Sequence, residues 1–234
     1  MGTDSNKDLS FLLDEIREEV WATRHLTGRP ALEERVMEAL RQVPRHEFVP
    51  EELRHGAYAN HPLTIGFGQT ISQPYIVALM TDLIRPRVED VVLEIGTGSG
   101  YQAAILARLV KRVYSIEIVE ELAREAGARL QRLGYHNIEV RAGNGRLGWP
   151  EHAPYDAILV TAAASRIPST LIEQLKPGGT LVIPVGAQHA AQDLLVLRKT
   201  ANGRIEESSV LPVAFVPLTG TDADRDPDGM KGRT

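Results

Sequence analysis

Apolar residues recur at helical spacing near the start of the chain and predict two amphipathic helices. The first covers 9–20, where leucine, isoleucine and valine fall on one face and charged side chains on the other. The second covers 32–43 and is ended by Pro44. Residues 45–68 contain glycine and proline at short intervals and are predicted to be mostly loop. A third, more apolar helix is predicted after Pro74.

From Glu89 onward, short apolar runs alternate with amphipathic segments. Strands are predicted at 91–95, 113–117, 138–140, 155–160 and 181–185. Helices are predicted at 101–109, 119–133 and 169–175, with a Lys-Pro-Gly-Gly turn at 176–179. This alternation is typical of an open, doubly wound α/β sheet, in which ligands bind at the carboxyl ends of the strands.

After Gly186 the pattern becomes that of antiparallel strands. The runs 194–200 and 204–210 flank Ala-Asn-Gly at 201–203, which is typical of a β-hairpin. Residues 213–218 predict a last strand. The polar residues 221–234, rich in aspartate and glycine, are expected to be a disordered tail.

The first strand of the sheet runs directly into a glycine-rich turn, Gly96-Thr97-Gly98-Ser99-Gly100. Glycine allows a sharp turn and close approach of a ligand, and the N-terminus of the next helix offers unpaired N–H groups. The turn therefore predicts a nucleotide site. Tyr101 stands where a dinucleotide fingerprint needs its third glycine, and no Gly-Lys-Ser/Thr follows for a P-loop. A purely structural turn remains the alternative.

Two acidic residues flank this turn. Glu94 lies two residues before Gly96, and Glu117 ends the next strand, about 20 residues later, where an acid typically holds the ribose hydroxyls of a nucleoside. Two acids without a phosphate-binding cation suit a cationic adenosine cofactor. We therefore predict S-adenosylmethionine, with Glu94 near its amino-acid end and Glu117 on its ribose.

Together these features predict an α/β fold of the class I methyltransferase (Rossmann-like) type. It has a doubly wound sheet, a C-terminal antiparallel hairpin and an N-terminal helical cap. One globular domain is expected: residues 1–86 form the helical cap and a substrate-side segment, 87–220 the S-adenosylmethionine-binding core, and 221–234 the tail.

Composition restricts the partners. The net charge of −5 and a pI near 5.8 argue against general nucleic-acid binding. The absence of cysteine excludes disulfides, cysteine nucleophiles and thiolate metal sites, and no metal is expected. Neither a signal peptide nor a membrane-spanning apolar run is recognised, so a cytoplasmic protein is expected. A monomer is expected as well.

Several sequence blocks resemble the protein-L-isoaspartate (D-aspartate) O-methyltransferase family over roughly residues 9–219. They include Val-Pro-Arg-His-Glu-Phe-Val-Pro at 43–50, the glycine turn, Leu-Lys-Pro-Gly-Gly at 175–179 and Phe-Val-Pro-Leu at 215–218. The most specific are Thr-Ile-Ser-Gln-Pro, within Gly-Phe-Gly-Gln-Thr-Ile-Ser-Gln-Pro at 66–74, and the Phe-Val-Pro-Leu ending. The resemblance implies methyl transfer from S-adenosylmethionine, with S-adenosyl-L-homocysteine as product. The acceptor is the free α-carboxylate of L-isoaspartyl or D-aspartyl residues in damaged proteins and peptides, and a succinimide then forms to start repair.

The resemblance also implies roles for individual residues. Ser72 would be the active-site residue, orienting the acceptor carboxylate, although its local pattern also suits an N-cap of the following helix. Substrate contacts are implied for Ile65, Ser72 and Thr219. Cofactor contacts are implied for Gln69, Thr70, Ile71, Glu94, Gly96, Gly98, Ser99, Gly100, Glu117, Ile118, Asn144 and Gly145.

Two positions depart from the family pattern. Asn144 lies in a loop that commonly reads Gly-Asp-Gly, so a charge-assisted bond to the adenine amino group would be lost. Asn60 stands where the family often has aspartate. These departures motivate one alternative to repair, an inactive cofactor-binding module. A separate alternative is a relative that methylates normal aspartate in a biosynthetic peptide. A nicotinamide oxidoreductase is disfavoured by Tyr101, and a serine hydrolase by the absence of Gly-x-Ser-x-Gly around Ser72.

Overall fold

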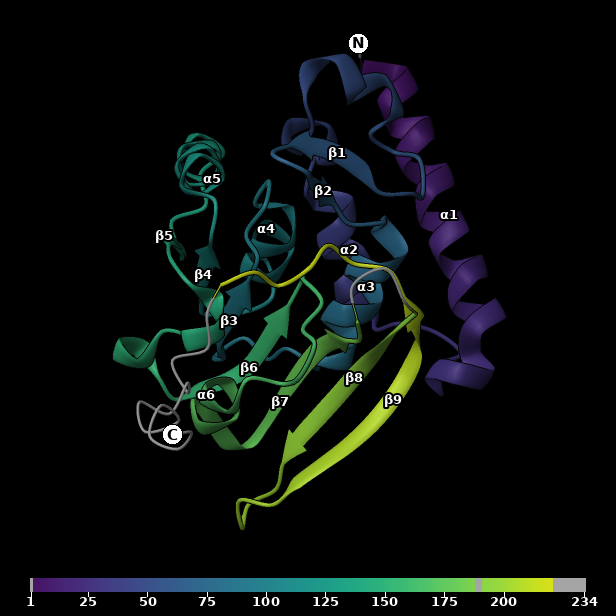
Figure 1. Cartoon of the computed structure of the whole chain (residues 1–234). Helices are drawn as coiled ribbons and strands as arrows, with labels where there is room; N and C mark the ends of the chain where they lie inside the picture. The colour runs from purple at the N-terminus through teal and green to yellow at the C-terminus, as the bar shows by residue number, and fades with distance from the viewer. Residues whose placement is uncertain (1, 188–190, 221–234) are drawn as a thin grey trace, which may run out of the picture.

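The structure is a computed structural model that describes residues 2–187 and 191–220, so the predicted tail at 221–234 lies outside the described residues. Within them, a seven-stranded sheet has the order β5-β4-β3-β6-β7-β8-β9 (Figure 1). The first five strands in this order are mutually parallel, and β8 and β9 are antiparallel to their neighbours. The strands are β3 (Val91–Ile95), β4 (Arg112–Glu117), β5 (Ile138–Ala142), β6 (Tyr155–Val160), β7 (Leu175–Val185), β8 (Gln192–Lys199) and β9 (Ile205–Val213).

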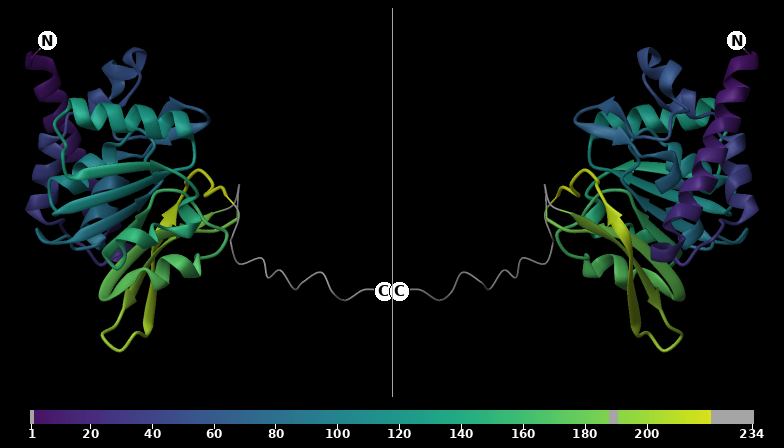
Figure 2. Two further views of the ribbon diagram at one scale, coloured as in Figure 1. Left: turned by 90° about the vertical axis from the view of Figure 1, so that its left-hand side faces the viewer. Right: turned by 90° about the vertical axis from the view of Figure 1, so that its right-hand side faces the viewer.

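Helices cover both faces of the sheet. They are α1 (Gly2–Thr27), α2 (Glu34–Gln42), α3 (Pro74–Leu83), α4 (Tyr101–Ala107), α5 (Glu120–Arg132) and α6 (Ser169–Glu173). Short 3₁₀ segments are η1 (Arg45–Phe48), η2 (Glu51–Gly56), η3 (Gly145–Leu147) and η4 (Pro150–His152). Figure 2 shows α5 and α6 on opposite sides of the sheet. None of the described helices is both long and apolar enough to cross a bilayer.

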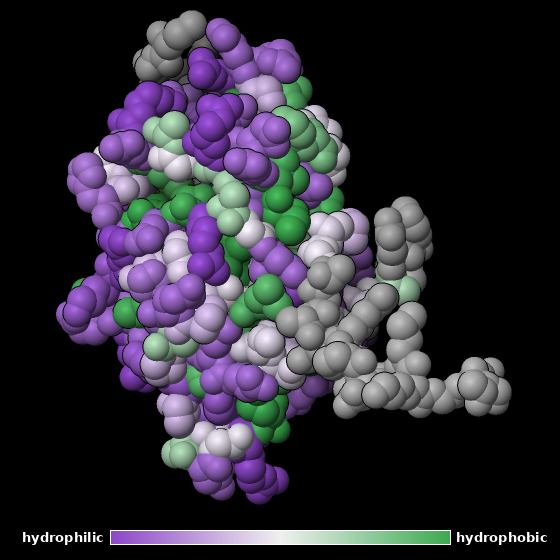
Figure 3. Space-filling view, turned by 60° about the vertical axis from the view of Figure 1, so that its left-hand side comes forward, coloured by the Kyte–Doolittle hydropathy of each residue, from purple (hydrophilic) through white to green (hydrophobic). Residues whose placement is uncertain are grey.

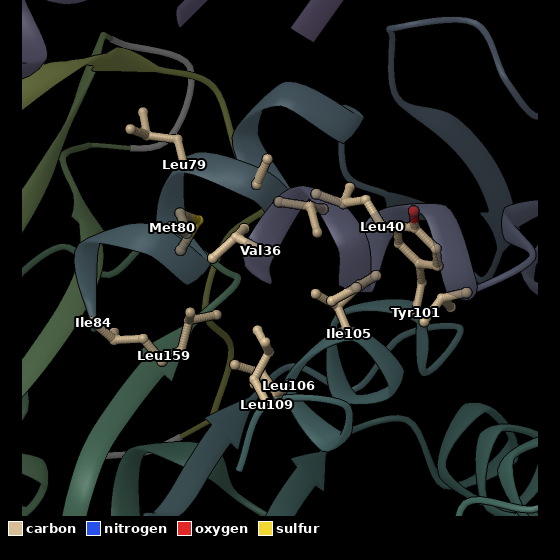
Figure 4. Close-up of a cluster of buried hydrophobic side chains, with 14 of the residues drawn as sticks. Val36, Leu40, Leu79, Met80, Ile84, Tyr101, Ile105, Leu106, Leu109 and Leu159 are labelled. Atoms are coloured by element: carbon tan, nitrogen blue, oxygen red, sulfur yellow. The ribbon is translucent and has the colours of Figure 1, made fainter. Parts of the chain in front are cut away.

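Alternation along the strands divides the core into two clusters. Val92 and Leu159 point toward the face covered by α1 to α4, whereas Leu93 and Ile158, each one residue away, pack in the cluster beside α6. Figure 4 shows side chains of α2, α3 and α4 meeting over the first of these faces. Outside the core, the face of the molecule in Figure 3 is mostly hydrophilic, with apolar side chains in separate patches.

The segment predicted to be loop at 45–68 is more ordered than expected. It contains η1, η2 and the strand β1 (Leu63–Gly66), which pairs with β2 (Gln69–Ile71) in a separate two-stranded hairpin. Such short strands leave too little alternation for a sequence pattern to detect. The turn of this hairpin, Gly66-Phe67-Gly68, has positive φ at all three residues, which explains its two glycines.

Two predictions in the C-terminal half were wrong. The turn expected at 176–179 lies within β7, where pairing with β6 jumps from Tyr155–Leu175 to Ala157–Thr180. The last strand expected at 213–218 does not form, because β9 ends at Val213 and the chain leaves the sheet. Residues 214–220, which we call the C-terminal strap, instead cross the ends of the strands, where Leu218 N–H donates to Ala163 O at 2.7 Å (Figure 1).

Candidate active site

A cleft opens where the strand order reverses, between β3 and β6. It encloses about 740 Å³ of empty space, part of which is open to solvent. Its walls come from the loops after β3, β4, β5 and β6, together with β2 and the C-terminal strap. In open α/β sheets, this switch point at the carboxyl ends of the strands is where nucleotide ligands bind.

The glycine turn forms the floor of this cleft and is held in one conformation. Gly96 has a φ of +97°, and a Cβ built on it would stand 2.5 Å from Thr161 Oγ1. That hydroxyl donates to the Gly96 carbonyl at 2.7 Å, so the residue that follows β6 holds the start of the turn. On the other side, Gly96 N–H donates to Ile116 O in β4 at 2.8 Å. Any side chain at position 96 would therefore displace the turn.

Glu117 lies at the far side of the turn and lines the cleft. Its two carboxylate oxygens accept hydrogen bonds from the backbone N–H groups of Gly98 at 2.8 Å and Val119 at 3.0 Å. A carboxylate has about four acceptor positions, so both oxygens keep capacity for a further donor. Glu117 is thus fixed in place and can accept from a vicinal diol such as a ribose.

Glu94 is placed differently from the prediction. Its side chain is fully buried on the α4 side of β3 and does not line the cleft. One oxygen accepts a short hydrogen bond from Ser115 Oγ, which also bonds Thr97 Oγ1 in the turn at 2.5 Å. Burial, with a smaller contribution from the charge of Glu117, raises the pKa of Glu94 to about 8. Glu94 is therefore a protonated support beneath the turn at neutral pH, and its position does not favour direct contact with a ligand.

Ser72 occupies the boundary between this cleft and a second cavity. The second cavity encloses about 1150 Å³ of empty space, part of which is open to solvent, and lies between α1, the start of α3 and the C-terminal strap. Ser72, Thr70, Thr161 and Val216 line both spaces. The Ser72 hydroxyl forms no hydrogen bond to any other residue in the described part of the chain. A group held in one space and a group held in the other would therefore meet at Ser72.

The expected N-cap role of Ser72 is wrong. Gln73 is the N-cap of α3, and its side chain makes no capping bond. The backbone N–H of Tyr75 donates instead to Asn60 Oδ1 at 3.0 Å, so the cap comes from a loop 15 residues earlier. This leaves the Ser72 hydroxyl available to the site, because it is not used to satisfy the helix end.

Most of the residues predicted for the site line one or both spaces. They are Gln69, Thr70, Ile71, Ser72, Gly96, Gly98, Ser99, Glu117, Ile118, Gly145 and Thr219. Ile65, Glu94, Gly100 and Asn144 are not among the lining residues. Ile65 nevertheless lies next to the turn, since a Cβ on Gly98 would stand 3.3 Å from its Cδ1.

The loop after β5 carries Asn144 and Gly145, which have separate tasks. The Asn144 side chain accepts from Arg146 N–H at 3.1 Å and caps η3, and Gly220 of the C-terminal strap packs against it. Gly145 lines the cleft, and a Cβ there would stand 2.3 Å from Ile95 Cγ2. Asn144 thus shapes the loop while Gly145 lets the loop approach β3.

Sequence reasoning missed two lining residues of consequence. Thr161 directly follows β6, so the rule that ligands bind at strand ends would have found it. Glu19 lies on α1, on what reads as an ordinary solvated helix face, yet its carboxylate lines the second cavity. No local signal marks it. Among the described residues, no group of histidine, aspartate and glutamate is arranged to hold a metal ion.

The sheet order, the glycine turn and the cleft at the switch point define a class I methyltransferase fold. A solved structure described as a protein-L-isoaspartate O-methyltransferase superposes with a TM-score of 0.74 at 28% identity, covering 87% of this chain and 66% of that one. A second, from Plasmodium falciparum and described as being in complex with S-adenosyl-L-homocysteine, has a TM-score of 0.70 at 24% identity and covers 88% of this chain and 97% of its own.

The sequence comparisons are more specific. The family described as protein-L-isoaspartate(D-aspartate) O-methyltransferase (PCMT) matches residues 22–223, and the chain belongs to this family. Among its relatives is protein-L-isoaspartate O-methyltransferase 2 of Polaromonas sp. strain JS666. It is 60% identical over 209 residues, which cover 89% of this chain and 99% of that protein.

Proposed function

We propose that this protein transfers the methyl group of S-adenosylmethionine to the free α-carboxylate of L-isoaspartyl and D-aspartyl residues in damaged proteins and peptides. The observation that carries the proposal is the position of Ser72, half-buried at the junction of the cleft and the second cavity. Membership of the family and 60% identity to a relative named for this reaction support it.

The residues of the cleft fit the cofactor. The turn at Gly96 and the approach of Gly145 to Ile95 leave room that side chains would fill, and Glu117 presents a fixed carboxylate for the ribose hydroxyls. Gln69, Thr70 and Ile71 of β2 line the cleft and directly precede Ser72 in the chain. Ile118, which is 43% exposed, offers an apolar surface to the adenine.

The chemistry needs positioning more than proton transfer. S-adenosylmethionine supplies a methyl group on a sulfonium, and a carboxylate is already nucleophilic at neutral pH. A carboxylate oxygen forms the new bond to the methyl carbon while the C–S electron pair returns to sulfur, which gives a methyl ester and S-adenosyl-L-homocysteine. Ser72 donates a hydrogen bond that orients the carboxylate, and the C-terminal strap excludes water. Well-aligned proximity lowers the activation free energy of such a reaction by about 7–11 kcal/mol.

A peptide pair tests the proposal. Two peptides of identical sequence, one with isoaspartate and one with aspartate at a single position, are incubated with radiolabelled S-adenosylmethionine. Base-labile label on the isoaspartyl peptide alone is expected. Label on the aspartyl peptide would instead indicate the biosynthetic relative, and label on neither would indicate an inactive cofactor-binding module.

Ser72→Ala tests the site itself. Loss of one hydrogen bond to a charged group costs about 1.5–3 kcal/mol, so kcat is expected to fall about 10- to 100-fold. Binding of S-adenosyl-L-homocysteine, measured by calorimetry, should stay unchanged because the variant retains the glycine turn and Glu117. Unchanged turnover would remove Ser72 from the mechanism.

The remaining partner assignments are also part of the proposal. We expect a cytoplasmic monomer that does not bind nucleic acid, in keeping with the net charge of −5. The division into a cap at 1–86 and a core at 87–220 is likewise part of the proposal, and both parts contribute lining residues to the cleft and to the second cavity. Size-exclusion chromatography with light scattering measures the oligomeric state directly.

A further inference from the structure

One acidic side chain lines the second cavity, and the proposed reaction does not use it. Of the residues that line the cavity, Glu19 of α1 is the only acidic or basic side chain; the others are polar, aromatic or aliphatic. Glu19 is half-buried, and its carboxylate lies on the same cavity as Ser72. A carboxylate that lines a partly buried cavity without a cationic partner calls for an explanation, because desolvation disfavours its charged form.

Neighbouring amides fix this carboxylate without neutralising it. Asn60 Nδ2 donates to Glu19 Oε2 at 2.8 Å, and Gln73 Nε2 donates to the same oxygen at 3.0 Å and to Oε1 at 3.3 Å. These donors are uncharged, and no ion pair to Glu19 occurs within residues 2–187 and 191–220. Burial accordingly raises the pKa of Glu19. The carboxylate is thus held in a defined direction with its charge uncompensated.

Gln73 links this charge to the reaction centre. It follows Ser72 directly in the chain, lines the same cavity and spans the distance to α1 through its side chain. A substrate residue oriented by Ser72 would have its chain neighbours within reach of Glu19, since an extended peptide advances about 3.3–3.6 Å per residue. A lysine or arginine side chain adds enough length to reach from up to about three residues away.

We propose that Glu19 forms a specificity subsite that binds a lysine or arginine side chain flanking the isoaspartyl residue. This inference rests on the proposed function and names the class of peptide that the same site prefers. A cation supplies the missing countercharge, whereas an acidic neighbour would be repelled by Glu19. The amide donors of Asn60 and Gln73 keep the carboxylate aimed at the cavity in the absence of substrate.

The test uses isoaspartyl peptides that differ at one position. Lysine, norleucine or glutamate is placed one or two residues before or after the isoaspartate, and kcat/KM is measured for each peptide. In at least one of these positions, the unmodified protein should prefer the lysine peptide over the glutamate peptide by about fivefold, as for a partly exposed ion pair. Glu19→Gln should reduce that ratio to less than about twofold.

Glu18→Gln is the matched control. Glu18 is exposed on the same helix and does not line the cavity, so the variant removes an equal charge and should keep the ratio of the unmodified protein. Equal kcat/KM for lysine and glutamate peptides at every position, or a ratio unchanged in Glu19→Gln, would overturn the subsite. Those results are distinct from failure of the proposed function, in which no isoaspartyl peptide is methylated at all.

Discussion

Arg45 Nη2 donates a hydrogen bond of 2.8 Å to the backbone carbonyl of Ser72. The guanidinium is fully buried, donates through Nε to Ala57 O at 3.0 Å and lies over the ring of Tyr101 at 4.9 Å. Arg45 thereby joins the segment that carries Ser72 to the loop after η2 and to the first residue of α4. Arg45 therefore holds the main chain at Ser72 without lining either cavity.

This relationship predicts that Arg45 positions Ser72. In Arg45→Lys, a single ammonium group cannot satisfy both carbonyls in the planar geometry of a guanidinium. We expect kcat to fall about tenfold, consistent with a weakened hydrogen bond to a charged donor, while the Kd for S-adenosyl-L-homocysteine is unchanged. Arg41→Met on the exposed face of α2 is the control and should alter neither quantity. A parallel loss of cofactor binding would mean that Arg45 supports the fold generally.

The buried carboxyl of Glu94 predicts a pH-dependent stability. Its pKa is raised from 4.5 to about 8 in the folded protein, so the folded state holds a proton that the unfolded state releases above about pH 4.5. The free energy of unfolding, relative to Glu94→Gln, should therefore fall as the pH rises from about 5 to 8 and level off above that. The slope is at most about 1.4 kcal/mol per pH unit.

Chemical denaturation of both proteins at pH 5, 6, 7 and 8 measures this difference. Glutamine keeps the shape of the side chain and cannot titrate, so the comparison isolates the carboxyl group. A difference in free energy that is constant across this range, or that rises with pH, would show that Glu94 is ionised in the folded protein.

The approach of Gly145 to Ile95 predicts a steric effect. The Cβ of Gly145→Ala would stand 2.3 Å from Ile95 Cγ2, so the loop after β5 or the end of β3 has to shift. We expect a loss of about 1–3 kcal/mol of stability and weaker cofactor binding, because Gly145 lines the cleft. In Gly127→Ala on α5, the new Cβ meets Val140 Cβ at an ordinary 3.9 Å. That variant should be neutral or gain up to about 1 kcal/mol.

The neighbours of Asn60 explain why asparagine stands there in place of the aspartate that the family often has. Its carbonyl accepts from Tyr75 N–H, and its amide donates to Glu19, so one side chain caps α3 and holds α1. Asn60→Asp would keep the cap but place a second carboxylate beside Glu19. We expect the free energy of unfolding at pH 7 to fall by about 1–2 kcal/mol, as for a buried acceptor left without its donor. It should recover as the pH is lowered, because protonation of one carboxylate removes the repulsion between the two.

The double variant Asn60→Asp with Glu19→Gln provides the control for this effect. Glutamine at position 19 can donate to the new carboxylate, so most of the lost stability should return. If the double variant changed the free energy of unfolding by the sum of the two single changes, these two side chains would contribute no interaction free energy.

The site was predictable where it depends on residues close together in the chain. The glycine turn, Glu117 at the end of the next strand and the Thr-Ile-Ser-Gln-Pro segment were all recognisable, and each lines the cleft. Glu94 was assigned to the ligand because it precedes the turn. A strand residue faces one side of the sheet or the other, and the sequence did not show that α4 covers the side that Glu94 occupies.

The alternation of apolar runs with amphipathic segments determined the succession of strands and helices from β3 to β7 and the parallel core. The Asn-Gly pair between two β runs determined the hairpin at the C-terminus, because these patterns act over a few residues at a time. The tertiary structure decided which distant residues meet. Gln73 bonds Glu19 from 54 residues away, Arg45 reaches Ser72 across 27, and residues 214–220 form a strap rather than a strand. Such contacts follow from packing and from the need to satisfy buried polar groups, and no local propensity encodes them.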